Sequence, residues 1–373
     1  MKNKVLTGLL LVLIGGWGSL SAQSAGSNYS RQVNTLIGTK GVGLTSGYLY
    51  PGATYPYGMV QFTPSYFSKR SGFVINQLSG GGCEHMGNFP TFPVKGKLKM
   101  SPDNILNYRI NISEEKGHAG YYEAMVQEDI KAKLTVTERT GMASYEYPAD
   151  QQYGTVIIGG GISATPIEQA AIVITAPNKC EGYAEGGNFC GLRTPYKVYF
   201  VAEFDTDALE SGTWKRNELK PNTTFAEGEY SGVYFTFDVN KKKNIQYKIG
   251  VSYVSVENAR ENLKAENTGW DFLQIQNQAE SKWNHYLGKI EVEGTNPDRT
   301  TQFYTHLYRS FIHPNVCSDV NGEYMGADFK VHKSRSKHYT SFSNWDTYRT
   351  QIQLLSILDP EVVSDIVISH QLF

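Results

Sequence analysis

A change of hydrophobic period near Ser255 constrains the fold of this chain more than any other feature. Before that point apolar and polar residues alternate, as in residues 130–137, 233–238 and 245–253. Alternation with a period of two is typical of antiparallel strands that have one buried face and one face in water. Because helical patterning is sparse over this stretch, the sequence predicts an N-terminal antiparallel β-sandwich over about residues 28–255.

After Ser255 apolar residues recur at three- and four-residue steps, which is typical of amphipathic helices. The expected helices cover residues 256–263, 270–287, 296–312 and 343–355, and a last one opens at Asp359 and Pro360. A turn at Asn321 and Gly322 predicts a hairpin between them. Such helices cannot bury their apolar stripes without partners, so they pack on the sandwich or belong to a larger helical domain. We favour a larger domain that is cut short at Phe373.

Charge and aromatic content narrow the classes of function. The chain has 35 Lys and Arg against 36 Asp and Glu, which gives a net charge of -1. This balance of charges argues against a nucleic-acid-binding protein, because the affinity of proteins for nucleic acid comes mainly from cationic side chains that neutralise phosphates. The 25 Tyr, 17 Phe, 5 Trp and 37 Gly indicate many short strands and surfaces suited to flat polar ligands.

The N-terminus has the order of a secretory signal peptide. Lys2 and Lys4 precede the apolar run of residues 5–14, and small residues follow up to Ala22. The run is too short and too broken by glycine to span a bilayer. We therefore predict a signal peptide over residues 1–22, cleaved after Ala22, and a periplasmic or extracellular protein.

The four cysteines are Cys83, Cys180, Cys190 and Cys317. Export permits disulfides. Cys180 and Cys190 bracket a glycine-rich stretch and are the best candidates for a pair, while two unpaired thiols are an equally good interpretation. Zinc is not expected, because neither CxxC nor paired His spacing occurs.

Two loops could carry chemistry. In residues 80–90, three glycines let the backbone approach a ligand closely, and Cys83, Glu84 and His85 offer polar groups. A Cys–His nucleophilic pair lacks an orienting third group, so a loop that contacts substrate is the better interpretation. The second loop, residues 49–60, is rich in Pro, Gly and Tyr, and a structural role at a domain boundary explains it more simply than sugar stacking.

A third candidate is the cluster of residues 345–349. Trp345 can stack on a pyranose face and Asp346 can accept sugar hydroxyls, while Arg349 lies four residues on along the expected helix. An equally good interpretation is structural: Asp346 complements the helix dipole and Arg349 pairs with it. Further acidic residues near Asp319 lack the spacing of a calcium loop, and the hairpin turn explains them.

Several segments, in the same order, resemble glycoside hydrolase family 92, the bacterial calcium-dependent exo-α-mannosidases. They are residues 33–39, 51–53, 56–60, 78–83 (LSGGGC), 185–191 (EGGNFCG), 313–315 and 339–349 (YTSFSNWDTYR). Thr35 stands where the family usually has proline. The matches span nearly all of the chain that follows the signal peptide.

The resemblance implies a β-sandwich followed by an (α/α)6-barrel catalytic domain, with the active site between them. On this basis the chain divides into the signal peptide, a sandwich over residues 23–255, linker helices over 256–294, and the first helices of an incomplete barrel over 295–373. The resemblance also implies that Gly82, Cys83 and the Trp345–Asp346 cluster line a mannose pocket, with Arg349 supporting Asp346. Glu84 and His85 are included as substrate-binding candidates.

The family's general acid, general base and main calcium ligands lie on later helices and loops. The resemblance therefore assigns no catalytic or metal-binding residue here, and Ca²⁺ is expected as a cofactor held mainly outside this chain. We expect the N-terminal part of a secreted inverting exo-α-mannosidase that acts on terminal mannose of N-glycans or mannan and is inactive alone. A non-catalytic carbohydrate-binding β-sandwich is the alternative.

Overall fold

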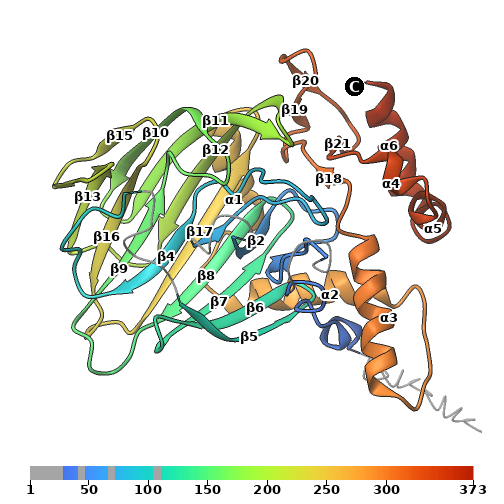
Figure 1. Ribbon diagram of the computed structural model, residues 1–373, viewed down its shortest axis with the longest axis horizontal. Coiled ribbons are helices and arrows are strands. Elements are labelled where there is room, and N and C mark those ends of the chain that lie inside the picture. The colour runs from blue at the N-terminus through green and yellow to red at the C-terminus, as the bar shows by residue number, and fades with distance from the viewer. Residues whose placement is uncertain (1–27, 41–46, 66–71, 104–110, 373) are drawn as a thin grey trace, which may run out of the picture.

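The computed structural model describes residues 28–40, 47–65, 72–103 and 111–372. Two antiparallel sheets stack to form a sandwich, and helices gather at one end of it (Figure 1). This arrangement confirms the predicted fold class. The predicted signal peptide lies outside the described residues.

The first sheet has eight strands within the described part of the chain. In sheet order they are β1 (Ala53–Thr54), β2 (Gln61–Pro64), β3 (Phe73–Val74), β4 (Thr91–Lys95), β9 (Tyr153–Gly159), β16 (Ser231–Asp238), β13 (Glu210–Lys215) and β14 (Glu218–Pro221).

The second sheet has nine described strands. In sheet order they are β15 (Phe225–Glu227), β10 (Ile167–Ala176), β11 (Lys179–Phe189), β12 (Leu192–Phe204), β17 (Asn244–Ser252), β8 (Thr140–Glu146), β7 (Ile130–Val136), β6 (Tyr121–Val126) and β5 (Ile112–His118). The chain passes repeatedly from one sheet to the other, so the two sheets form one folding unit around a shared core.

The alternating pattern places apolar side chains between the sheets. In β7, Ile130, Ala132 and Leu134 are fully buried, while the lysines between them are partly exposed. Aromatic residues of both sheets fill the core, among them Phe200 of the second sheet and Phe235 of the first. Burial of these apolar faces is the main favourable term that holds the sandwich together.

The helical half begins after β17. Its elements are α1 (Val256–Glu266), α2 (Phe272–Leu287), α3 (Pro297–Ser310), α4 (Asn344–Thr347), α5 (Gln351–Leu358) and α6 (Pro360–Gln371). A side chain caps each of the first three helices: Ser255, Asp271 and Asn296 each accept a backbone N–H of the first turn. The short strands β18 (Asn315–Val316), β19 (Glu323–Met325), β20 (Val331–Lys333) and β21 (Tyr339–Thr340) lie between α3 and α4.

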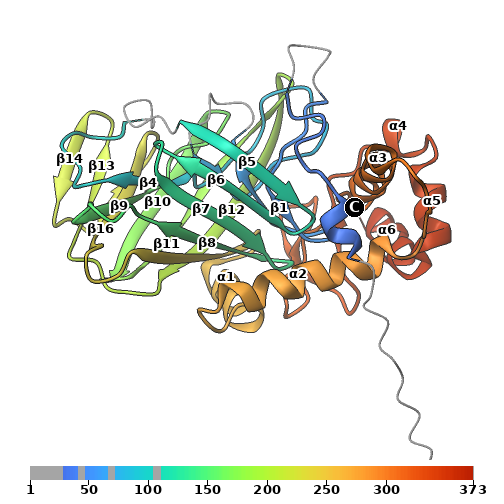
Figure 2. The same cartoon turned by 90° about the horizontal axis from the view of Figure 1, so that it is seen from below.

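The helices pack on the sandwich through a second buried cluster. Tyr57 from the sandwich loop meets Tyr286 of α2, Phe311 and Tyr339 with ring centroids 5.8, 6.0 and 6.2 Å apart. Seen from below, α2 runs along one face of the molecule from α1 toward the other helices (Figure 2). None of the described helices is both long and apolar enough to cross a bilayer.

The expected single helix over residues 343–355 is wrong. The structure has α4 and α5 instead, separated at Thr350, whose φ of 74° is left-handed. A left-handed residue ends an α-helix, because the next carbonyls turn away from the helix axis. Trp345 and Arg349 therefore do not share one face of a continuous helix.

Candidate functional site

The glycine-rich loop of residues 78–85 is built around two histidines. His85 is buried; its Nδ1–H donates to the Cys83 carbonyl at 2.7 Å, and its Nε2 accepts the Leu78 N–H at 2.8 Å. Only the neutral imidazole can do both, because a proton on Nε2 removes the acceptor. Burial accordingly lowers the pKa of His85.

His313 holds the same loop from the helical half. It follows α3, and its Nε2 accepts the Ser79 N–H at 2.8 Å. Burial lowers the pKa of His313 to about 4, so the ring stays neutral and can accept. Its carbonyl in turn accepts the Gln351 side-chain N–H at 3.3 Å. His313 therefore connects the glycine-rich loop to the start of α5.

The disulfide corrects the cysteine interpretation. Cys83 is bonded to Cys190, with the two Cα atoms 5.3 Å apart, while Cys180 and Cys317 are free and buried. The stretch between Cys180 and Cys190 is strand β11, not a loop. At about 3.3 Å per residue, a strand of this length places its two ends roughly 30 Å apart, so Cys180 and Cys190 cannot meet. Because Cys83 lacks a free thiol, the weak Cys–His nucleophile hypothesis is excluded.

Gly82 and Glu84 are exposed on this loop. A Cβ atom on Gly80 or Gly82 would meet nothing within 4 Å, so open space lies beside both residues. A Cβ on Gly81 would lie 2.7 Å from the His85 ring. The loop thus presents bare backbone to solvent on one side and packs tightly on its own histidine on the other.

The Trp345 cluster lies on the short helix α4 and the turn that follows it. Trp345 is 79% exposed, and the Asp346 carboxylate accepts the Ser343 hydroxyl at 2.6 Å. The Arg349 guanidinium lies 4.9 Å from the centre of the Tyr348 ring. An exposed indole beside an exposed carboxylate can stack on a sugar ring and accept its hydroxyls.

Sequence reasoning missed a buried ion cluster between the two halves. Arg139, in the turn between β7 and β8, donates to Glu138 at 2.6 Å and to Glu266 of α1 at 2.7 Å, and its Nε–H reaches the Ser318 carbonyl. Lys337 also pairs with Glu138. Burial would raise the pKa of Glu138, but the two cations outweigh burial and lower it. In the sequence, Glu138 and Arg139 are two adjacent charged residues, which is the usual composition of an exposed turn, so nothing marks them as buried.

Asp319 belongs to a buried hydrogen-bond network. Its buried carboxylate accepts hydrogen bonds from Ser252, Asn258 and Asn262 at 2.6 to 2.8 Å. The Gly322 N–H donates to the Asp319 carbonyl and closes a turn there, at a φ of 85° that suits glycine. This turn precedes the hairpin rather than forming it: β19 and β20 pair with each other and turn at residues 326–330, so the predicted position of the hairpin turn is wrong. Over the described residues, no three acidic, His or Cys side chains are grouped closely enough to hold a metal ion.

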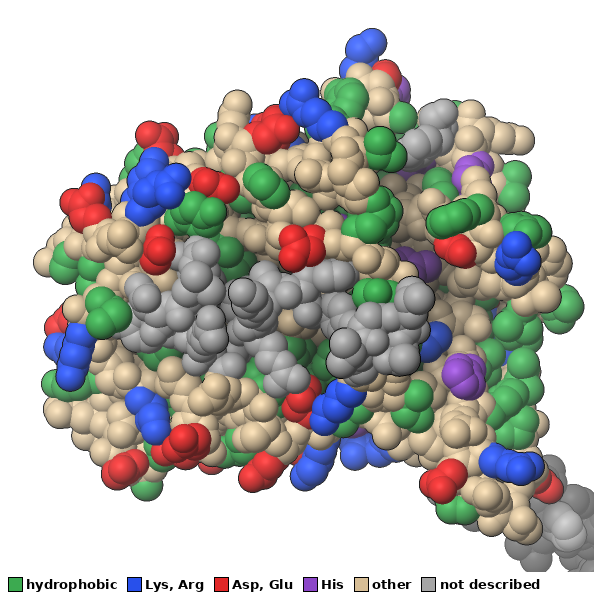
Figure 3. Space-filling model, viewed as in Figure 1, with side chains coloured by type: hydrophobic (Ala, Val, Ile, Leu, Met, Phe, Trp, Pro, Cys, Tyr) green, Lys and Arg blue, Asp and Glu red, His purple; other side chains and the backbone are tan. Residues whose placement is uncertain are grey.

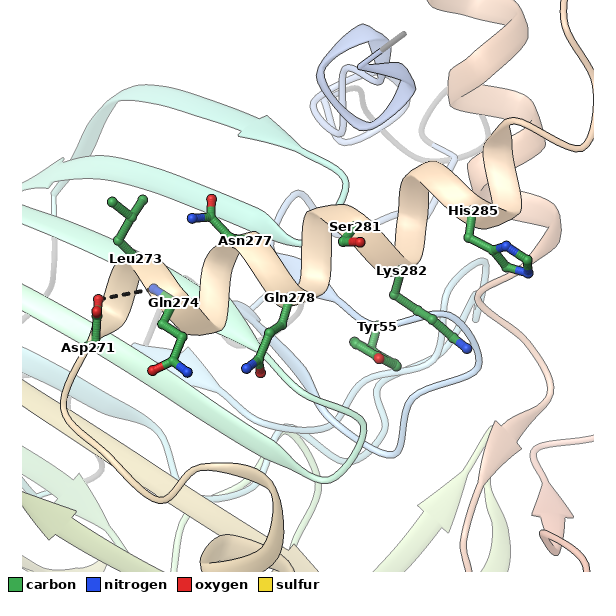
Figure 4. Close-up of a pocket in the computed structure, with 9 residues that line it drawn as sticks. All are labelled: Tyr55, Asp271, Leu273, Gln274, Asn277, Gln278, Ser281, Lys282 and His285. Atoms are coloured by element: carbon green, nitrogen blue, oxygen red, sulfur yellow. Dashed lines mark hydrogen bonds between the residues drawn. The ribbon is translucent and has the colours of Figure 1, made fainter. Parts of the chain in front are cut away.

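A groove of about 650 Å³ runs along the exposed side of α2. Gln274, Gln278 and Lys282 point from the helix toward the side on which Tyr55 lies (Figure 4). The groove is open, most of the residues that line it carry polar groups, and none of the predicted site residues is among them. We take the glycine-rich loop and the Trp345 cluster, not this groove, as the candidate site.

Two family models match the chain in succession. The glycosyl hydrolase family 92 N-terminal domain matches residues 32–252, and the family's catalytic domain matches residues 258–371. The chain belongs to glycosyl hydrolase family 92. The passage from one model to the other falls where the hydrophobic period changes and α1 begins.

Solved structures of the family share the fold. A family GH92 α-mannosidase from Bacteroides thetaiotaomicron is 25% identical with a TM-score of 0.83, covering 92% of this chain and 49% of its own length. Its complex with mannoimidazole is also similar, with a TM-score of 0.82. A family GH92 inverting mannosidase from the same organism is 25% identical with a TM-score of 0.79, covering 91% of this chain and 48% of its own.

A curated relative from Arthroderma benhamiae is described as an uncharacterized secreted glycosidase. It is 26% identical over an alignment of 363 positions that covers 86% of this chain and 45% of the relative. The chain thus spans about half the length of the relatives it matches.

Proposed function

We propose that this chain is the N-terminal part of a secreted, calcium-dependent, inverting exo-α-mannosidase that removes terminal mannose from N-glycans or mannan. One observation carries the proposal: a bare glycine loop of the sandwich is held by His313, a residue of the helical half. Through His313 the loop is connected to Gln351, which follows the Trp345 cluster closely in the chain, and this supports a shared site for residues 78–83 and 339–349. The similar mannosidases of Bacteroides support the choice of sugar.

In this proposal the described residues bind and orient the sugar rather than cleave it. Asp346 accepts sugar hydroxyls, Trp345 stacks on the ring, and the backbone at Gly82 approaches it. An inverting enzyme needs two carboxyl groups roughly 6.5–9.5 Å apart, with a water molecule between one of them and the sugar. We assign neither to this chain, and we propose that the 373-residue chain alone releases no mannose.

Calcium is retained in the proposal on the resemblance alone. Among the described residues, no three His, Cys, Asp or Glu side chains are grouped closely enough to hold a metal ion, so we assign no calcium ligand to them. The ligands are proposed to lie after Phe373. The apolar side chains exposed on the last helices, such as Ile357 (79%) and Val367 (49%), give further helices a surface to pack on.

The test uses the protein translated from the complete reading frame. It is incubated with a panel of α-linked mannobioses, with calcium and then with a chelator, and the released anomer is followed by proton NMR. Chelator-sensitive release of β-mannose supports the proposal and identifies the linkage. No release by folded protein overturns it.

The alternative is a non-catalytic carbohydrate-binding sandwich. It is favoured if the protein binds mannosides saturably but releases no sugar. The mixed surface charge of the sandwich, with both signs interspersed (Figure 3), suits a neutral ligand in either case. Titration calorimetry on the same preparation separates the two functions.

A further inference from the structure

The glycine-rich loop is held by several hydrogen bonds and by one covalent bond. His85 ties the two ends of the loop to each other, because it accepts the Leu78 N–H and donates to the Cys83 carbonyl. Two residues outside the loop hold its first half: His313 accepts the Ser79 N–H, and the Tyr48 carbonyl accepts the Gly80 N–H. The disulfide ties Cys83 to Cys190, which sits in the turn between β11 and β12. In that turn Asn188 accepts the Gly191 N–H at 3.1 Å, so the partner of Cys83 is itself held in place.

The two histidines alone do not fix the apex of the loop. Gly80, Gly81 and Gly82 have no side chains to pack, and glycine has more backbone freedom than any other residue. The Gly80 N–H donates to the Tyr48 carbonyl at 2.9 Å, but a Cβ atom on Gly82 would meet nothing within 4 Å, so the space beside Gly82 is open. Cys83 is the first residue after the apex that another part of the chain holds through its side chain, so the disulfide defines where the apex ends.

We propose that Cys83 and Cys190 are positioning residues for the sugar site. The disulfide holds the glycine apex where its backbone meets the sugar, so the oxidised protein binds mannosides tightly and the reduced protein binds them weakly. This inference rests on the proposed function. A dithiol reagent reduces the bond by two electrons and two protons, which gives two free thiols and a cyclic disulfide of the reagent.

Reduction should leave the fold intact, because the sandwich does not depend on this bond. The strand β11 stays paired along its length with β10 and β12, and the core between the sheets lies elsewhere. Cys190 is exposed and Cys83 is partly exposed, so a reagent can reach the bond. Cys180 and Cys317 are buried and already reduced, so they do not complicate the experiment.

The experiment measures kcat and KM for an α-mannoside on the full-length protein in its oxidised, reduced and reoxidised forms. Cys83→Ser, Cys190→Ser and the double variant are measured beside them, with thiol titration to count the free cysteines. We expect KM to rise at least tenfold on reduction and in each variant, with kcat within about twofold, and to recover on reoxidation. A KM effect with constant kcat is the signature of lost binding that the ground state and transition state share.

The control is Val233→Ala, which removes buried side-chain volume from the core side of β16. It lowers the melting temperature without touching the loop, so KM should stay at the wild-type value. A purely structural disulfide would make the reduced protein behave like this control, with a lower melting temperature and an unchanged KM, and that result overturns the inference.

The two proposals fail in different ways. If the oxidised protein releases no mannose, the proposed function fails and the positioning role falls with it. If the oxidised protein is active and KM is unchanged after titration shows two new thiols, only the positioning role fails. Should the serine variants not fold, reduction of the folded wild-type protein still gives the decisive comparison.

Discussion

At the scale of single residues, the contact between the glycine-rich loop and the helical half depends on two histidines that must stay neutral. His313 and His85 each use Nε2 to accept a backbone N–H, and burial lowers the pKa of both. A depressed histidine pKa means that the unfolded chain takes up a proton before the folded one does. The stability that His313 provides is therefore complete above its ordinary pKa of 6.5 and is lost as the pH falls toward about 4.

This linkage predicts a pH dependence that one variant removes. Between pH 7 and pH 4.5, the free energy of unfolding of the wild-type protein should fall by up to about 3 kcal/mol more than that of His313→Gln. Urea unfolding at several pH values measures the difference. The control, His306→Gln, changes an exposed histidine on α3 and should follow the wild-type curve. Parallel curves for wild type and His313→Gln would contradict the prediction.

Neighbouring glycines in the loop should respond in opposite ways to the same change. Gly81→Ala puts a methyl group 2.7 Å from the His85 ring, so the ring must move and its hydrogen bonds weaken. We expect a loss of about 1–3 kcal/mol in the free energy of unfolding, as for other overpacked sites.

Gly82→Ala is the matched variant, because its methyl group enters open space. Its stability should stay within about 0.5 kcal/mol of wild type. If the apex contacts the sugar as proposed, mannoside KM rises in Gly82→Ala nonetheless. Thermal unfolding measures the stability of the two variants, and kinetics on the same samples measure their KM. Equal stabilities would show that the contact between residue 81 and the His85 ring is unimportant.

At the scale of elements, the turn between β7 and β8 ties the sandwich to α1. Arg139 is 7% exposed at its side chain; it shares Glu138 with Lys337 and is the cation that pairs with Glu266. Removing one partner of a buried ion pair leaves an uncompensated charge, which costs far more than the pair contributes. We therefore expect Arg139→Ala to lower the free energy of unfolding by about 3–5 kcal/mol.

An exposed pair in the same sandwich provides the control. Arg193 also meets a glutamate, Glu168, through two hydrogen bonds, but its side chain is 72% exposed. Water screens such a pair, so Arg193→Ala should cost about 0–1 kcal/mol. Guanidinium unfolding of both variants tests the contrast. Similar losses for the two would mean that burial at the β7–β8 turn does not set the cost.

Elements also show what the sequence could and could not predict. The strands β7, β16 and β17 and the capped helices α1 to α3 follow from local periodicity and cap residues, which a single sequence displays. The Cys83–Cys190 bond and the contact of Arg139 with Glu266 join residues far apart in the chain, and the local pattern carries no signal for the break at Thr350. Cys83 and Cys190 are separated by 107 positions, so no local spacing could pair them. The candidate loop was found from its glycines, but the two histidines that fix it became visible only in the structure.

At the scale of the whole molecule, α2 joins the two halves. Trp283 of α2 is fully buried, its indole N–H donates to the Thr54 carbonyl at 2.7 Å, and its ring centre lies 4.5 Å from that of Tyr308 in α3. On the same helix, Glu280 accepts hydrogen bonds from Arg31 and His118, which lie before and within the sandwich. The helical half is thus packed onto the sandwich rather than tethered to it.

This packing predicts that truncating a buried side chain of α2 destabilises both the sandwich and the helical half. Trp283→Ala should lower the free energy of unfolding by about 3–5 kcal/mol, as for other buried aromatic truncations. Hydrogen exchange should then rise together in α3 and in the β1 region, because both lose the same partner. Leu273→Ala, at a 59% exposed position of the same helix, should change stability by less than about 0.5 kcal/mol. Faster exchange confined to the helices in Trp283→Ala would show instead that the two halves open independently, and that the junction carrying the candidate site is held by the loop contacts alone.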